Sequence, residues 1–320
     1  MHIQRIFSLL LSAITLLSCE TVVDIDLPVE PTRLVVNGFI NPDSAVAVRI
    51  SKSRFVLDRS QAFTLVDDAI VTLFENGLEV TQLTTEGEGW YTSSFRPQAG
   101  SEYIIQASAS GLEPVEANTE VLPIVVIKAL TADSVRRETG TSCFNDDCQP
   151  IYSTDYRVQL SLSDPVNQDN FYEVQAYTVV VDSFPVFDDN SDEPTGYDVI
   201  TYRGEAYLTS DDPVVSSTEF DFGDGAFFGS SLLFTDEIFS GNEYTLNFTS
   251  EGSFGGNITR LIIVLRTLSN DQYQYLRTLQ LQEYNEGDPF AEVVPVYNNI
   301  ENGFGIFAGY SADSVVVDID

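Results

Sequence analysis

Histidine is almost missing from this chain of 320 residues. The single histidine, His2, lies within residues 1–18, which we expect to be removed from the mature protein. Without imidazole, neither a Ser-His-Asp triad nor a Cys-His pair can form, and zinc or iron sites built on imidazole are excluded as well. The chemistry left open uses carboxylates, metals with oxygen ligands, or Tyr and Ser. No pair of carboxylates stands out from the acidic background, so we expect a protein that is not an enzyme.

Positive charge is also scarce. The chain has 15 Lys and Arg residues against 49 Asp and Glu residues, a formal net charge of −34, and its only lysines are Lys52 and Lys128. Such a surface repels nucleic acids and anionic lipid headgroups, so we expect neither as a direct electrostatic partner. It attracts cations, Ca²⁺ among them, although a solvated acidic exterior accounts for the same composition.

Cysteine occurs three times, as Cys19, Cys143 and Cys148. In an exported protein, two cysteines as close as Cys143 and Cys148 are expected to form a local disulfide. A metal site would need further soft ligands nearby, and the sequence has none there. Because the closed loop is short, the bridge is expected to shape a loop tip rather than to hold the fold together.

The beginning of the chain is expected to direct export. Residues 6–17 form an apolar run that follows Arg5 and ends at Cys19 in the sequence LLSC. A basic residue, a short apolar segment and a small residue before the cut are typical of a signal peptide, and the run is too short to span a bilayer. An N-terminal core helix is the alternative. Because LLSC is similar to a bacterial lipobox, we expect residues 1–18 to be removed and Cys19 to be acylated, which anchors the chain in membrane lipid.

Period-2 alternation of apolar residues predicts β-strands over much of the chain. Residues 45–51 (AVAVRIS) and 102–109 (EYIIQASA) both place apolar side chains on one face. Asn76-Gly77 lies between two further strand-like runs and predicts a hairpin turn. Short strands separated by turn signals favour a β-sandwich, which we assign to residues 19–127.

A second, larger β-rich domain is expected in residues 128–320. Its segment 183–197 is rich in Pro and Asp and is expected to be an exposed loop. One helix is predicted near residues 270–285, because Ser269 followed three residues later by Gln272 is typical of a capping box. The predicted fold class is therefore mainly β, with a single helix of about four turns.

Several segments carry a family resemblance in their order and spacing: CETVVDIDLP (19–28), LVVNGFI (34–40), DDAIVTLFENG (67–77), GWYTSSF (89–95), SEYIIQASASGLEPVEA (101–117), SDPVNQDNFYEV (163–174), SNDQYQYLRTLQ (269–280) and VYNNIENGFGIFAGYSAD (296–313). Together they resemble the DUF4249 family of Bacteroidetes-type lipoproteins over essentially the whole mature chain. The first region also looks like an immunoglobulin-like or transthyretin-like sandwich. The resemblance implies an outer-membrane lipoprotein, often encoded beside TonB-dependent receptors, and it supplies no catalytic residues.

One acidic segment invites a calcium interpretation. In the sequence DDNSDEPTG, the residues Asp188, Asn190 and Asp192 have the spacing of ligands 1, 3 and 5 of an EF-hand loop. Position 6 is Glu193 instead of Gly, and position 12 is Val199 instead of Glu, so an EF-hand is excluded. A different calcium loop and a solvated acidic loop remain as alternatives.

Residues 302–311 (NGFGIFAGYS) alternate glycines with large apolar side chains. Glycine admits close backbone approach, so Phe304, Ile306, Phe307 and Tyr310 are candidates for a binding patch. A tightly packed, barrel-like corner is the alternative.

These expectations combine into one function. We expect a lipid-anchored, two-domain β protein at the outer membrane, on its periplasmic face or at the cell surface. It is expected to act by binding, as an accessory partner of a TonB-dependent uptake receptor. The alternatives are a carboxylate-dependent glycan hydrolase and an adhesion module stabilised by Ca²⁺.

Overall fold

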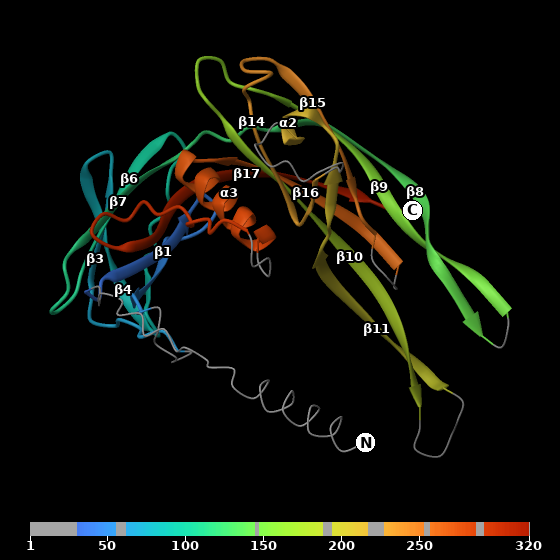
Figure 1. Ribbon diagram of the computed structural model, residues 1–320, viewed down its shortest axis with the longest axis horizontal. Helices are drawn as coiled ribbons and strands as arrows, with labels where there is room; N and C mark the ends of the chain where they lie inside the picture. Colours follow the sequence, from blue (N-terminus) through green and yellow to red (C-terminus); the bar gives the residue numbers. More distant parts are fainter. Residues whose placement is uncertain are drawn as a thin grey trace, which may run out of the picture. The chain divides into compact units, whose positions relative to one another are not determined.

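The computed structural model describes residues 31–55, 62–144, 147–187, 194–216, 227–252, 257–285 and 291–319. From Thr32 onward these residues, Phe55 excepted, belong to one compact unit. The expectation of a mainly β protein is confirmed, because this part of the chain consists of two sheets and two short helices (Figure 1).

The larger sheet has twelve strands and is mixed. In spatial order it contains β11 (Pro194–Glu205), β10 (Phe171–Phe187), β16 (Asn257–Leu268), β17 (Phe304–Asp318), β1 (Leu34–Ile40), β2 (Ala47–Lys52), β5 (Trp90–Thr92), β4 (Leu78–Gly87), β3 (Ile70–Glu75), β6 (Ser101–Ser108) and β7 (Val115–Val121), with β14 (Ser231–Thr235) paired to β10.

Strand β17 joins the two halves of this sheet. Its first part, Phe304–Gly309, runs parallel to β1, and its second part, Tyr310–Asp318, runs antiparallel to β16. The strand therefore links a segment near residue 35 with one near residue 265. The pairing of β17 with β1 therefore connects the predicted domain of residues 128–320 with the predicted domain of residues 19–127. The division into these two domains stays a prediction.

The smaller sheet is antiparallel and packs on the larger one. It contains β13 (Phe227–Gly229), β12 (Leu208–Ser210), β15 (Glu243–Ser250), β9 (Asp147–Ser163) and β8 (Ile127–Phe144). A buried apolar cluster lies between the two sheets, with Leu160 and Leu246 from the smaller sheet and Val174 and Ile263 from the larger one. A second cluster fills the space enclosed by strands β1 to β7.

The local sequence explains the strands of the N-terminal region. Along β6 the side chains alternate between buried and exposed or half-buried positions, and Tyr103 and Ile105 are both buried, as the period-2 pattern predicted. Asn76 and Gly77 connect β3 and β4 with φ angles of 50° and 80°. A two-residue hairpin turn with positive φ at both central residues is the geometry that Asn-Gly favours.

The predicted helix is present as α3 (Asn270–Asn285), and a four-residue helix, α2 (Pro213–Ser216), was not predicted. The capping box forms only in part. Ser269 Oγ accepts a hydrogen bond from Gln272 N at 3.2 Å, but Ser269 N donates to Gly309 O of β17 at 2.8 Å. The tertiary contact thus replaces the return bond of the box, and Gln272 Oε1 has no partner. No helix in the described residues combines the length and the hydrophobicity needed to cross a membrane.

Candidate functional site

The clearest candidate surface is the outer part of the hairpin formed by β10 and β11. Strand β10 pairs with β16 only as far as Val181, and β14 pairs with it only between Phe171 and Gln175. Beyond that point β11 is the only described strand that pairs with Asp182–Phe187, and the two form a two-stranded ribbon (Figure 1). We call Asp182–Phe187 together with Pro194–Tyr202 the β10–β11 arm.

Large apolar side chains are exposed on both faces of this arm. Their exposed fractions run from 38% to 66%, and the residues are Phe184, Val186, Tyr197, Val199, Ile200 and Tyr202. Asp182 is opposite Ile200 and Phe184 is opposite Asp198, so Phe184 and Ile200 share one face. Tyr197 and Val199 lie on the other face. The arm therefore has no buried side of its own.

This exposure is unusual for a soluble domain. An isolated two-stranded hairpin is only marginally stable in water, because it cannot bury an apolar face. Within the described ranges both backbone edges of the arm are unpaired, since β11 is the last strand of the sheet and the pairing of β10 with β16 stops at Val181. Unpaired edges with exposed apolar side chains are a template for pairing with another chain. The arm thus has the chemistry of a protein-binding surface.

The expectation of a loop over residues 183–197 was wrong at both of its ends. Strand β10 continues to Phe187, and β11 begins at Pro194. Proline is tolerated in a strand where no ladder hydrogen bond is lost, and Pro185 lies where β10 has a single neighbour. A signal was present in the sequence, because residues 197–202 (YDVITY) place apolar side chains at both odd and even positions.

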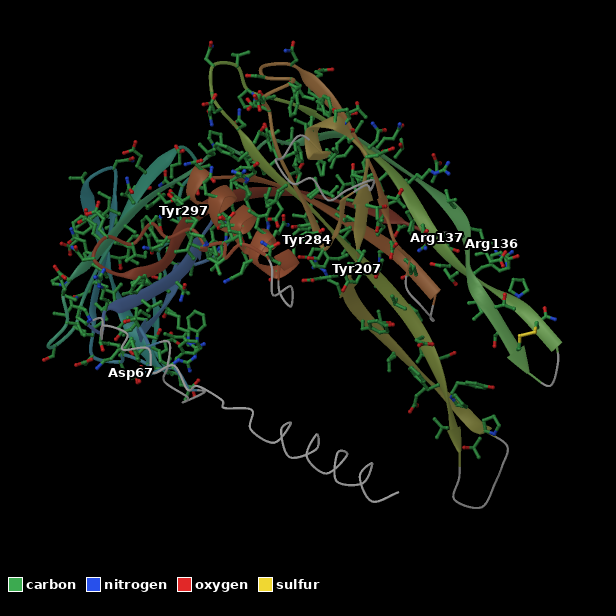
Figure 2. All side chains as sticks on the ribbon, viewed as in Figure 1. Asp67, Arg136, Arg137, Tyr207, Tyr284 and Tyr297 are labelled. Atoms are coloured by element: carbon green, nitrogen blue, oxygen red, sulfur yellow. A yellow bond between two sulfur atoms is a disulfide. The ribbon has the colours of Figure 1, made fainter. Side chains whose placement is uncertain are left out.

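The other long hairpin, formed by β8 and β9, is stabilised by its own contacts. Residues Asp147–Asp155 pair only with β8, and a disulfide joins Cys143 to Cys148 near the end of the ribbon (Figure 2). The guanidinium of Arg136 lies 3.8 Å from the centroid of the Tyr152 ring, on the same ribbon. On the β10–β11 arm, by comparison, Thr195 Oγ1 donates across the strands to Val186 O at 3.1 Å, and no disulfide joins its described residues.

Arg137 of β8 forms ion pairs with Asp155 of β9 and with Glu251, which follows β15. Arg137 Nε donates to Asp155 Oδ2 at 2.5 Å, and Arg137 Nη2 lies 3.3 Å from Glu251 Oε1. Burial by itself would raise the pKa of Asp155, but hydrogen bonds from Arg137 and Gly252 N hold that pKa below its ordinary value. Asp155 is therefore a charged, structural residue of this hairpin.

The predicted binding patch is divided by the structure. Phe304 is 44% exposed and lies under the guanidinium of Arg33. Ile306 and Phe307 are buried, and Tyr310 is half-buried. Ile306 and Phe307 therefore pack in the interior, as the packing alternative expects.

Glycine is required in this segment because the backbones approach closely. A Cβ atom at Gly305, whose φ is +112°, would lie 2.1 Å from Val36 O, and one at Gly309 would lie 2.2 Å from Glu120 O. Asn299 contributes to the same packing, since its side chain accepts from Phe307 N at 3.0 Å and donates to Phe307 O at 2.8 Å. Residues 302–311 thus form a packed junction of β17 with its neighbours.

The remaining predicted site residues lie outside the described residues. These are Cys19 with the segment 1–18, and the acidic residues Asp188, Asn190 and Asp192. Within the described ranges, no group of three or more His, Cys, Asp or Glu side chains converges in a way that could hold a metal ion.

A shallow groove of about 540 Å³ lies on the smaller sheet and includes Asp133, Arg157 and Asp211 in its lining. Both aspartates are exposed to solvent. The general acid of a glycosidase is usually placed in an apolar pocket that keeps it protonated. The groove therefore does not favour the hydrolase alternative.

Comparisons with known proteins give a family. The profile described as Domain of unknown function (DUF4249) matches residues 20–315. No curated protein matches the chain.

Two solved structures are similar over part of their length. A protein of Corynebacterium diphtheriae named as membrane anchored matches with 10% identity and a TM-score of 0.22, over 76% of this chain and 55% of its own. The collagen adhesin of S. aureus matches with 9% identity and a TM-score of 0.20, over 89% of this chain and 95% of its own. Such low TM-scores carry no argument about function. The profile match, which extends over nearly all of the sequence, shows that this chain belongs to the DUF4249 family.

Proposed function

We propose that this protein is a lipid-anchored binding protein of the outer membrane that holds a partner protein through the β10–β11 arm. The observation that carries the proposal is the apolar exposure of both faces of a two-stranded ribbon whose two edges pair with no other strand of the described part of the chain. Acylation of Cys19 supplies the anchor, on the periplasmic face or at the cell surface. The protein acts without catalysis.

The arm supports binding by strand addition. A strand of the partner can pair with a free edge, where backbone hydrogen bonds provide affinity and the alternate side chains provide specificity. Tyrosines are enriched among the residues that dominate binding energy, and Tyr197 and Tyr202 are both exposed on the arm. The partner we propose is a TonB-dependent uptake receptor, which the family resemblance implies.

The test is recovery of the receptor from gently solubilised outer membranes with the chain as bait. The arm variant carries Tyr197→Ser and Ile200→Ser, and the control variant carries Tyr152→Ser and Ile151→Ser on the β8–β9 hairpin. Both variants remove the same residue types from exposed positions of a two-stranded ribbon. All four side chains are exposed, and the Arg136–Tyr152 contact that the control removes lies on an exposed ribbon, so the fold is expected to survive both changes.

Truncation of a tyrosine that acts as a hot spot costs about 2 kcal/mol or more, which is about a 30-fold loss of affinity. We therefore expect the arm variant to lose the receptor and the control variant to keep it. Equal recovery with both variants would exclude the arm as the binding surface. Failure of the unmodified chain to recover any receptor would exclude the proposed partner.

A further inference from the structure

Two buried aspartates that are distant in sequence meet where β9 and β14 end. Asp164 follows β9, and Asp236 follows β14; each is 5% exposed. Asp164 N donates to Asn242 O at 3.0 Å, and Asp164 Oδ2 accepts from Gly241 N at 2.7 Å. The hydroxyl of Tyr172 donates to Asp164 Oδ1. These bonds position Asp164 firmly against the loop that follows Asp236.

The loop that begins at Asp236 returns to Asp164. Phe239 N donates to Asp236 O at 2.8 Å, and two residues later Gly241 N donates to Asp164 Oδ2 at 2.7 Å. Burial, together with the nearby Asp236 charge, raises the pKa of Asp164. Neither carboxylate forms an ion pair in the described part of the chain. Their surroundings are apolar, because Phe234 and Phe239 stack on the ring of Tyr172. Two buried carboxyl groups at such a site are stabilised either by a bound cation or by a proton on one of them.

A third buried oxygen belongs to Asn170, whose backbone pairs with Asp236. Asp236 N donates to Asn170 O at 3.2 Å, and the neighbouring register pairs Phe171 with Thr235 and Tyr172 with Phe234. Asn170 is therefore opposite Asp236, and their side chains project from the sheet face that carries Tyr172. Asn170 is 1% exposed, and its Nδ2 donates to Gln168 O at 3.1 Å. Asn170 Oδ1 and Asp236 Oδ2 are both buried and have no hydrogen-bond partner.

We propose that Asp164, Asp236 and Asn170 bind a Ca²⁺ ion. All the available ligand atoms are oxygens, which excludes metals that prefer nitrogen or sulfur. Calcium takes six to eight oxygens in flexible geometry and accepts amide oxygens beside carboxylates. Backbone carbonyls and water complete its coordination.

The unpartnered amide distinguishes a cation from a shared proton. A proton shared between Asp164 and Asp236 would neutralise one charge, but it would leave Asn170 Oδ1 buried without a partner. A cation neutralises both carboxylates and also binds that oxygen. These ligands come from segments 164–170 and 236, which differ from the acidic segment that the sequence suggested for calcium.

The experiment measures Ca²⁺ binding by the purified full chain after treatment with a chelator. Isothermal titration with CaCl₂ at neutral pH is expected to show one saturable site beyond weak surface binding. Thermal unfolding is expected to occur at a higher temperature with Ca²⁺ than with chelator, because a ligand that binds only the folded state stabilises it. An unchanged unfolding temperature, together with no saturable binding at millimolar Ca²⁺, would overturn the proposal.

Three variants assign the site. Asp236→Asn removes one charged ligand and is expected to weaken binding at least tenfold. Asn170→Leu changes no charge and is expected to weaken Ca²⁺ binding several-fold. The same change would not affect a proton shared between Asp164 and Asp236. The matched control is Asp212→Asn, because Asp212 is equally buried but accepts bonds from Tyr244 and Asn247. The control is expected to keep the Ca²⁺-dependent rise in unfolding temperature.

Two results would decide for a shared proton instead. The unfolding temperatures of the unmodified chain and of Asp236→Asn would then each be the same with Ca²⁺ as with chelator, because a proton rather than the ion neutralises the pair. Asn170→Leu would also leave the Ca²⁺ titration unchanged.

If the variants fail to fold, Tb³⁺ replaces Ca²⁺ as the probe of the unmodified chain. Tyr172 is bonded to Asp164, so it is expected to sensitise Tb³⁺ emission that Ca²⁺ displaces with one-site stoichiometry. Absence of displaceable emission would overturn the proposal.

Discussion

Gly309→Ala is expected to destabilise the fold, because β17 approaches β7 too closely for a side chain. A Cβ atom at Gly309 would lie 2.2 Å from Glu120 O and 2.9 Å from Val121 Cγ2. The nearest atom is a backbone oxygen, which cannot rotate away as a flexible side chain would. One of the two strands therefore has to move, in a part of the molecule where Phe307 and Val121 are fully buried.

The movement disturbs buried hydrogen bonds as well as packing. Gly309 O accepts from Ser269 N at 2.8 Å, and Gly309 N lies 3.1 Å from Thr119 Oγ1. Overpacking a core costs about 1–3 kcal/mol, and a buried polar group left without its partner costs about 1–3 kcal/mol. We therefore expect Gly309→Ala to lower the free energy of unfolding by about 2–6 kcal/mol.

Urea unfolding followed by circular dichroism measures this free energy. The control is Gly204→Ala, where the nearest atom to an added Cβ is Thr178 Oγ1 at 3.9 Å. The control is expected to lie within about 0.5 kcal/mol of the unmodified chain. The packing argument is refuted if Gly309→Ala also lies within about 1 kcal/mol of the unmodified chain. Weaker partner binding with unchanged stability would instead support residues 302–311 as a binding edge.

Two further predictions concern charge and anchoring. Arg137→Met is expected to lower the free energy of unfolding at pH 7 by about 1–2 kcal/mol, because Asp155 loses an ion-pair partner that is itself 46% exposed to screening solvent. The folded-state pKa of Asp155 is depressed, so this stability is present above the unfolded pKa of about 3.9 and is lost as the pH falls through the folded value. The difference between the two proteins should therefore vanish on acidification, and a constant difference from pH 7 to pH 3 would contradict the assignment. Cys19→Ser is expected to abolish incorporation of a radiolabelled fatty acid, and unchanged labelling would exclude the lipid anchor.

Local sequence patterns were sufficient for the features that depend on neighbouring residues. Alternation identified β2 and β6, Asn76-Gly77 identified the hairpin between β3 and β4, and Ser269 marked the beginning of α3. Each of these features follows from a side-chain period, a preferred φ angle or a cap within a few residues. The signal peptide and the lipidated cysteine are predictions of the same local kind.

Pairings between distant segments were decided only in the tertiary structure. The parallel pairing of β17 with β1 buries Ile306 and Phe307, which the sequence alone could equally place in a binding patch. The β10–β11 arm is exposed because β16 begins only at Asn257, beside Val181, and no property of the arm's own residues sets that position.

The approach of Asp164 to Asp236 likewise depends on how the segments after β9 and β14 meet. The sequence by itself determined the fold class, the local turns and the helix, because these features arise from interactions over a few residues. The tertiary structure decided which side chains are covered and which carboxylates meet. Strand register and the packing of loops depend on contacts between residues far apart in the chain, and a one-residue change of register would turn every side chain to the other face.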